Sequence, residues 1–113
     1  MEPMPRIVKM YVASNGDCPF RDFLDDLEHQ AAFGYITARI ARLRQGAFGD
    51  WKSLGDGMGE LRVHHGPGYR IYFGIDGEQL VLLCGGKKNR QKRDIAAANR
   101  FWRHYCEKKD GRL

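Results

Sequence analysis

The residues best suited to chemistry are basic, and they gather in one short segment. Residues 87–93 contain no acid and five positive charges, which come from Lys87, Lys88, Arg90, Lys92 and Arg93. The rest of the chain holds 14 basic and 14 acidic side chains, so this segment accounts for the formal net charge of +5. A charge confined in this way favours a phosphate-bearing partner, and a solvated helix end is the alternative.

Two glycines stand directly before the basic segment, at the expected passage from a strand into a helix. Gly85-Gly86 follows an apolar run, and a helical pattern begins near Asn89. A helix N-terminus binds anions through its free N–H groups, and glycines let a phosphate approach closely. Cations at that end cost about 0.3–1 kcal/mol each when exposed, and an anion would relieve this. We therefore predict a phosphate site over residues 85–93, with Lys87, Lys88 and Arg90 binding substrate.

A second polar group alternates along two expected strands and so shares one sheet face, opposite the core. It consists of Arg62, His64, Arg70 and Tyr72. Cleavage of RNA by its own 2′-hydroxyl needs a base, an acid and cations for the developing charge. Arg62 and Arg70 suit the charge role, His64 is a candidate base, and Tyr72 could stack on a nucleobase. Cross-strand pairing, with Glu60 neutralising an arginine and Tyr72 partly buried, is the structural alternative.

Other candidate motifs predict less chemistry. Lys52 is a further candidate for substrate binding at the polar sheet face. The stretch Leu54–Gly59 precedes a strand where a nucleotide-binding loop would precede a helix, so we predict only a flexible entry to a hairpin. His64 and His65 are neighbours on an expected strand and point to opposite faces, so they cannot hold one metal ion together. The three cysteines form no CxxC pair, so they do not suggest a zinc site. No metal or cofactor is expected.

Strands and helices must bring these residues together. The expected strands cover residues 6–13, 58–65, 69–75 and 79–84, and the expected helices cover 19–27, 31–45 and 89–108. The apolar spacing predicts that the second helix buries Phe33, Ile36, Ile40 and Leu43, and that the last helix buries Ile95, Ala98, Trp102 and Tyr105. The residues around Phe48, Trp51 and Lys52 are expected to be a loop. The order is β-α-α-β-β-β-α, with an antiparallel meander and an antiparallel pair of helices.

The length and composition fit one domain over residues 1–113. The chain is 42% apolar and 29% charged, which is globular composition. No apolar run approaches the roughly 20 residues of a membrane span, and the start of the chain lacks the apolar region of a secretory signal. We therefore expect a cytoplasmic protein.

Several consecutive blocks of the sequence resemble the HigB-like addiction-module killer branch of the RelE/ParE toxin superfamily. They are residues 52–62, residues 66–73, residues 82–88 with Asp94-Ile95, and the upstream residues 19–24. The resemblance covers nearly the whole chain. It implies an α+β, RelE-like fold, in which an antiparallel-rich sheet packs against a helical hairpin and a C-terminal helix.

The resemblance also implies a function. Such proteins are toxins of type II toxin–antitoxin systems, usually ribosome-associated, metal-independent endoribonucleases that cleave mRNA and arrest translation. A small helix-turn-helix antitoxin neutralises them, and operator DNA is bound only through the antitoxin complex. Two alternatives stay open, namely a non-enzymatic toxin that poisons DNA gyrase and a catalytically inactive co-repressor that binds the antitoxin.

The match carries over Arg62 and Arg70 as phosphate-stabilising cations, and Lys52, Lys87 and Lys88 as looser candidates for substrate binding or proton transfer. The C-terminal catalytic tyrosine or histidine of some RelE-type nucleases is not carried over, because His104 and Tyr105 lie within an expected helix. The two arginines and the basic bend after Gly86 are expected to hold a nucleic-acid backbone jointly. Arginines locked into internal ion pairs would contradict this expectation.

Overall fold

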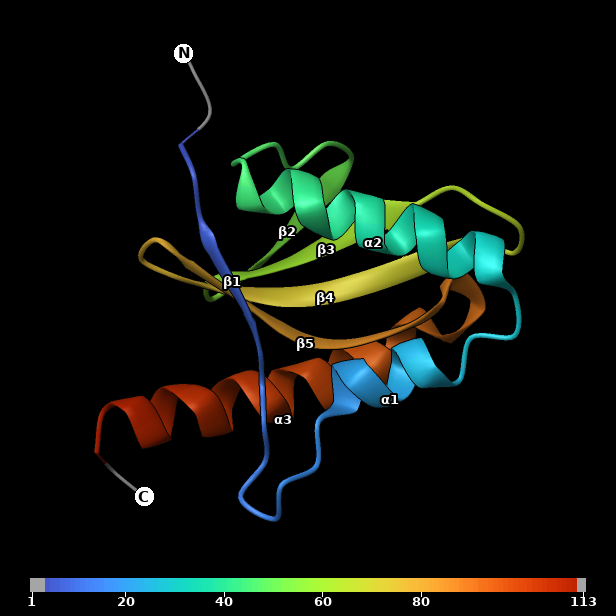
Figure 1. Ribbon diagram of the computed structural model, residues 1–113. Helices are drawn as coiled ribbons and strands as arrows, with labels where there is room; N and C mark the ends of the chain where they lie inside the picture. The colour runs from blue at the N-terminus through green and yellow to red at the C-terminus, as the bar shows by residue number, and fades with distance from the viewer. Residues whose placement is uncertain (1–3, 112–113) are drawn as a thin grey trace.

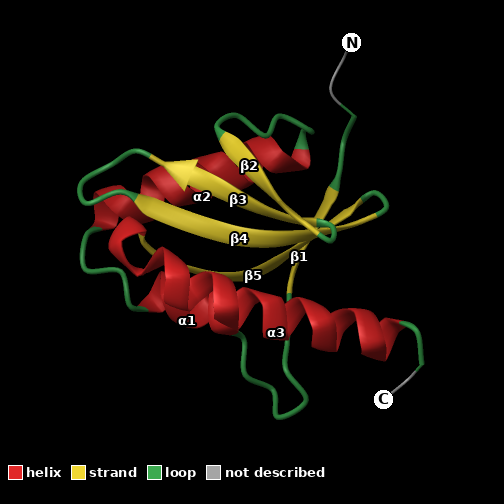
Figure 2. Cartoon of the chain, turned by 180° about the vertical axis from the view of Figure 1, so that it is seen from behind, coloured by secondary structure: helices red, strands yellow, loops and turns green. Residues whose placement is uncertain are grey.

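The computed structural model describes residues 4–111, which form a central sheet covered on both faces by helices (Figures 1 and 2). The strands are β1 (Ile7–Met10), β2 (Trp51–Gly55), β3 (Met58–Val63), β4 (Tyr69–Asp76) and β5 (Gln79–Lys87). The helices are α1 (Pro19–Asp25), α2 (Gln30–Arg44) and α3 (Gln91–Lys109), and the short 3-10 turn Lys88–Arg90 leads into α3. The strand order is β1-β5-β4-β3-β2, with β1 parallel to β5 and every other pair antiparallel.

The described residues include one strand more than the sequence predicted. The stretch predicted as a loop and a flexible entry is the hairpin β2–β3, in which Lys52 lies opposite Glu60. Asp56 and Gly57 both have positive φ, at 53° and 81°, as a tight two-residue hairpin turn requires. This turn was predicted as part of a loop because several glycines stand close together in the sequence.

The first sheet face is covered by α1 and α2. Phe20 of α1 and Ile36 of α2 are fully buried against the strands. α1 lies over β5 while α2 lies over β1 and β3, so the two helices predicted as an antiparallel pair pack mainly on the sheet rather than on each other. The buried stripe of α2 begins at Ala32, and Phe33, which was predicted to be buried, is 47% exposed. A small side chain at position 32 lets the helix approach the sheet and turns position 33 outward.

The second face is covered by α3, as the spacing of its apolar residues predicted. Ala98 and Trp102 are buried, and Ile95 and Tyr105 pack beside them. Trp102 lies directly over Gly74, where an added Cβ would stand 2.3 Å from the indole ring. Within residues 4–111, no helix combines the length and the apolarity needed to cross a membrane.

A bulge in β5 controls which face its last residues occupy. The pairing with β4 shifts between Tyr72 and Phe73, so Leu83 and Cys84 both pack on the α3 side. The residues that follow therefore change face. Gly85 faces α1, Gly86 faces α3, and Lys87 pairs with Tyr69 on the α1 side. β5 thus runs three residues past its predicted end at Cys84.

Candidate functional site

Arg62 and Arg70 meet as predicted, but they meet around a buried carboxylate. They are direct cross-strand partners on the α3 side of the sheet. Glu60, which is 1% exposed, accepts a hydrogen bond from Arg62 Nε at 3.2 Å, and Arg70 Nε lies 3.7 Å from the same oxygen. The other Glu60 oxygen accepts a hydrogen bond from Gln91 Nε2 at 2.9 Å. This Glu60 cluster ties β3 and β4 to the start of α3.

Tyr72, Lys52 and His64 were also predicted at this face, and Tyr72 contradicts the expectation. Tyr72 has no exposed surface, so its ring cannot stack on a nucleobase, and burial raises the pKa of its hydroxyl. Lys52 is exposed on β2. His64 lies just past the end of β3, with Nε2 2.5 Å from Asp50 Oδ2. That hydrogen bond lowers the pKa of Asp50.

The predicted joint cradle of arginines and lysines is wrong because Arg62 and Arg70 are paired with Glu60. The bulge in β5 also places Lys87 on the α1 side, while Arg62 and Arg70 point to the α3 side.

The glycines before the basic segment make room for protein groups on the side where a Cβ would point. An added Cβ would stand 2.7 Å from the Phe23 ring at Gly85 and 2.0 Å from an Asp94 carboxylate oxygen at Gly86. Close packing of these protein groups therefore requires both glycines. The backbone N–H of Lys88 is also used, because it donates to the Gly68 carbonyl.

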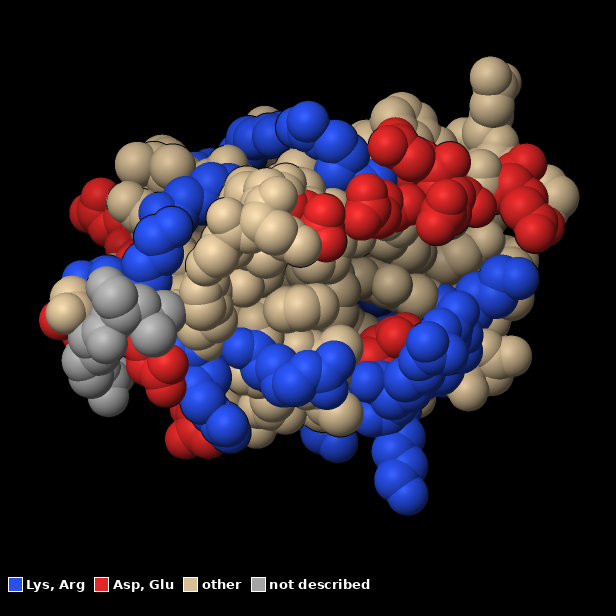
Figure 3. Space-filling model, turned by 90° about the horizontal axis from the view of Figure 1, so that it is seen from below, with Lys and Arg blue, Asp and Glu red and all other residues tan. Residues whose placement is uncertain are grey.

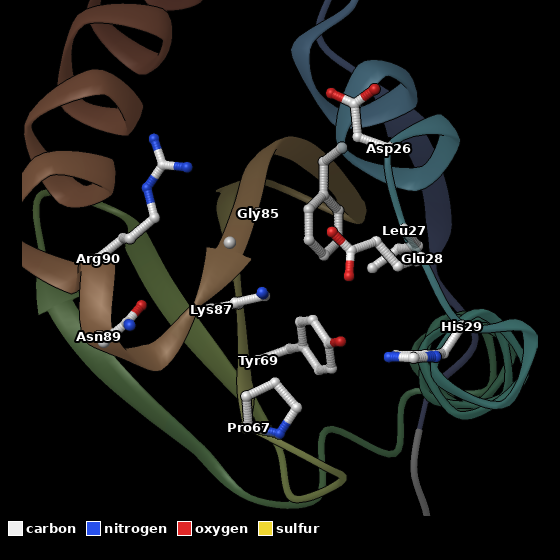
Figure 4. A pocket seen from close by; sticks show the side chains of 12 residues that line it. Asp26, Leu27, Glu28, His29, Pro67, Tyr69, Gly85, Lys87, Asn89 and Arg90 are labelled. Carbon is white, nitrogen blue, oxygen red and sulfur yellow. The ribbon is translucent and has the colours of Figure 1, made fainter.

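A groove opens beside this junction, and we call it the junction groove. Its volume is about 540 Å³. One wall comes from the connection between α1 and α2, and the other comes from the end of β5 and the turn before α3 (Figure 4). The lining residues are Phe23, Asp26, Leu27, Glu28 and His29 on the first side, Pro67, Tyr69, Gly85 and Gly86 beneath, and Lys87, Asn89 and Arg90 on the second side.

Three side chains converge in the junction groove. Tyr69 and Lys87 are cross-strand partners, so the phenol ring and the lysine stem lie side by side. His29 stands at the N-cap of α2 and points toward the Tyr69 hydroxyl, while Lys87 points into the groove from the other side (Figure 4). Within residues 4–111, the side chains of His29 and Lys87 make no hydrogen bond or ion pair. They are free to meet a ligand.

The charges around the groove are arranged by sign. Acidic atoms gather along one side of an uncharged central surface, and basic atoms gather along the other side (Figure 3). The exposed acids of the first wall and its helix are Asp22, Asp25, Asp26 and Glu28. The exposed bases of the second wall and of the segment that leads from it into α3 are Lys87, Lys88, Arg90, Lys92 and Arg93. Burial raises the pKa of Asp94 behind the basic wall, and Arg90 and Arg93 oppose that rise. A phosphate chain fits only the basic side.

The groove combines a proton-transfer group with cations and an aromatic ring. Imidazole is the most frequent general acid or base in proteins, and cations stabilise a phosphate that gains charge. Lys87 and Arg90 were predicted as binding residues, and both line the groove. Lys88 lies beside it with its stem against Gly68. Among residues 4–111, no three His, Cys, Asp or Glu side chains are placed to hold a metal ion.

Two lining residues escaped the sequence analysis. His29 lies in a polar connection between two helices, where no pattern relates it to β5. Tyr69 begins the strand predicted over residues 69–75 and is 3% exposed, but its hydroxyl end reaches the groove. The single available signal was the position of His29 two residues before the helix predicted over residues 31–45.

Comparison with known proteins gives two matches. A family model described as "Phage derived protein Gp49-like (DUF891)" matches residues 22–103, a range that includes every residue of the groove. An uncharacterised protein of Haemophilus influenzae is 46% identical over 80 residues, which cover 70% of this chain and 81% of that protein. No solved structure matches the chain.

Proposed function

Because the chain belongs to the Gp49-like family of phage-derived proteins, a family of the addiction-module killer and RelE-like toxin group, we propose that it cleaves mRNA in the junction groove. In this proposal it is the toxin of a type II toxin–antitoxin system that acts at the ribosome and arrests translation. The observation that carries the proposal is the convergence of His29, Lys87 and Tyr69 in one groove with a basic wall.

The proposed reaction uses only groups that line the groove. The 2′-hydroxyl oxygen attacks the adjacent phosphorus while His29 takes its proton. The bond from phosphorus to the 5′ oxygen breaks, and the Lys87 ammonium gives that oxygen a proton. Arg90 stabilises the charge that builds on the phosphate oxygens. The products are a 2′,3′-cyclic phosphate and a 5′-hydroxyl end, and the proposed reaction uses no metal ion.

The test is to map RNA 5′-hydroxyl ends after brief expression of the wild type, His29→Ala and the double variant Lys87→Ala, Arg90→Ala. We expect new 5′-hydroxyl ends with the wild type. General acid–base groups contribute about 10²- to 10⁴-fold, so His29→Ala should lower the yield of ends by at least about 100-fold. Equal end patterns for the wild type and both variants would contradict the proposed site.

The control removes the same charge outside the groove. Arg103 and Lys108 are exposed on α3 and do not line the groove. The double variant Arg103→Ala, Lys108→Ala should keep the wild-type pattern of ends. A wild type that induces DNA-damage signalling and leaves mRNA intact would favour gyrase poisoning, and a wild type without growth arrest would favour the co-repressor.

The family also indicates an antitoxin partner. We propose a helix-turn-helix antitoxin that covers the basic wall with an acidic segment, because residues 87–93 carry five exposed or partly exposed positive charges and no acid. Operator DNA would then be contacted by the antitoxin in the complex.

A further inference from the structure

We propose that Tyr35 and His65 form a stacking platform for an unpaired base of the RNA strand bound in the junction groove, an inference that rests on the proposed function. The two rings stack with centroids 4.4 Å apart and planes 23° apart. Tyr35 comes from the second turn of α2 and His65 from the connection between β3 and β4. The proposal makes single-stranded RNA longer than the groove the preferred substrate.

The outer face of the Tyr35 ring is open. Tyr35 is 56% exposed, an unusual state for a large aromatic side chain. Its neighbours one turn away along α2 are Ala31, Ala32, Ala38 and Arg39. The alanines are too short to cover the ring, and the Arg39 guanidinium is bound to the backbone carbonyls of Arg62 and Phe48. A nucleobase can therefore lie on this face and continue the stack begun by His65.

His65 holds the Tyr35 ring in place before any ligand arrives. A ring fixed in advance loses less conformational freedom when a base stacks on it, so more of the stacking energy contributes to affinity. Stacking of a base on an aromatic ring is sequence-tolerant, because every base offers a flat face. The platform would therefore extend the contact without selecting one base.

The platform and the groove are joined by one short segment. Residues 64–68 connect β3 to β4, and within them Pro67 lines the groove while His65 stacks on Tyr35. The turn is closed by a hydrogen bond from the Gly68 N–H to the His65 carbonyl. His29 at the start of α2 also lines the groove. A strand leaving the groove over this turn arrives at Tyr35.

The test measures binding of 2′-O-methyl RNA oligonucleotides, which cannot be cleaved, by fluorescence anisotropy at low salt. Oligonucleotides of three and eight nucleotides are compared, together with an eight-nucleotide chain whose outer positions are abasic. Tyr35→Ala should weaken binding of the full eight-nucleotide chain about 5- to 150-fold, the range expected for one base stacked on one ring. Binding of the shorter and the abasic chains should change less than twofold.

Two further variants separate stacking from general damage. Tyr35→Phe keeps the ring and should bind like the wild type. Phe33→Ala removes a similarly exposed aromatic side chain from another side of α2 and should also bind like the wild type. Equal affinity of Tyr35→Ala and the wild type for the full chain would overturn the platform, as would an equal loss with Phe33→Ala.

The groove variant Lys87→Ala, Arg90→Ala distinguishes the two proposals. If it binds all chains like the wild type while Tyr35→Ala loses affinity, the proposed groove is wrong and the stacking surface stands. A loss with the groove variant alone overturns the platform and leaves the groove. A wild type that binds none of the oligonucleotides overturns both.

Discussion

Removal of both arginines from the Glu60 cluster should destabilise the fold rather than selectively stop the chemistry. Glu60 is 1% exposed, while the side chains of Arg62 and Arg70 are 33% and 11% exposed. Breaking a buried ion pair from one side costs about 3–5 kcal/mol, because the remaining charge is left without compensation. Arg62 is partly in water and Gln91 keeps its hydrogen bond, so we expect a loss of about 3 kcal/mol for Arg62→Ala, Arg70→Ala.

The measurement is urea denaturation of purified protein, followed by circular dichroism. A loss of about 3 kcal/mol lowers the unfolding midpoint by roughly 1.5 M at a slope of about 2 kcal/mol per M. Addition of Glu60→Gln to the double variant removes the orphaned charge and should restore at least half of the lost stability. A loss under about 1 kcal/mol, or no recovery with Glu60→Gln, would refute the structural role.

The triple variant also decides the catalytic question. A double variant that loses toxicity gives no information if it is unfolded. A folded Glu60→Gln, Arg62→Ala, Arg70→Ala protein that still produces 5′-hydroxyl ends shows that the arginines are not required for the chemistry. A folded triple variant that produces no such ends would show that the arginines are required for the chemistry.

Three further substitutions test the packing and the electrostatics. Gly74→Ala should destabilise the fold by about 1–3 kcal/mol, because its Cβ would stand 2.3 Å from the Trp102 ring. Gly34→Ala should stabilise α2 by about 0.5–1 kcal/mol, because nothing lies within 4 Å of the added Cβ. Thermal denaturation of both variants measures these changes. Hydrogen bonds from Lys109 and Tyr105 lower the pKa of Asp76, so Asp76→Asn should be less stable than the wild type at neutral pH. Because the folded-state pKa is lowered, this difference should shrink as the pH falls through that pKa, and a constant difference in urea titrations from pH 7 down to pH 2 would contradict it.

Regular periodicity made part of the fold predictable. The buried side of α3 follows from the spacing of Ile95, Ala98 and Trp102, and the alternation of β3 and β4 follows from their apolar residues. Both patterns are local, so a single sequence contains them. The strand β2 was missed because its turn at Asp56-Gly57 lies among other glycines. Phe33 was predicted to be buried because the apolar spacing of α2 fits a stripe that starts at Phe33 as well as one that starts at Ala32.

The site was predicted only in part, because the decisive relations are not local. Lys87 and Arg90 were recognisable from the density of charge around them. The face that Lys87 occupies depends on a bulge at Leu83, and simple alternation along β5 assigns it to the wrong side. His29 joins the groove only when α1 and α2 pack over the sheet, a contact between segments almost 60 residues apart in the chain.

The two faces of the sheet therefore have different roles, one in stability and the other in binding. On the α3 side, the Glu60 cluster is buried and paired, so its residues should affect stability more than RNA binding. On the α1 side, His29 and Lys87 are exposed and make no hydrogen bond or ion pair within residues 4–111, so their replacement leaves no buried group without a partner. Groove variants should therefore unfold at the same urea concentration as the wild type, although their affinity for RNA is lower. A groove variant that unfolds early would show that the groove side chains hold the fold together, and the division between the faces would be wrong.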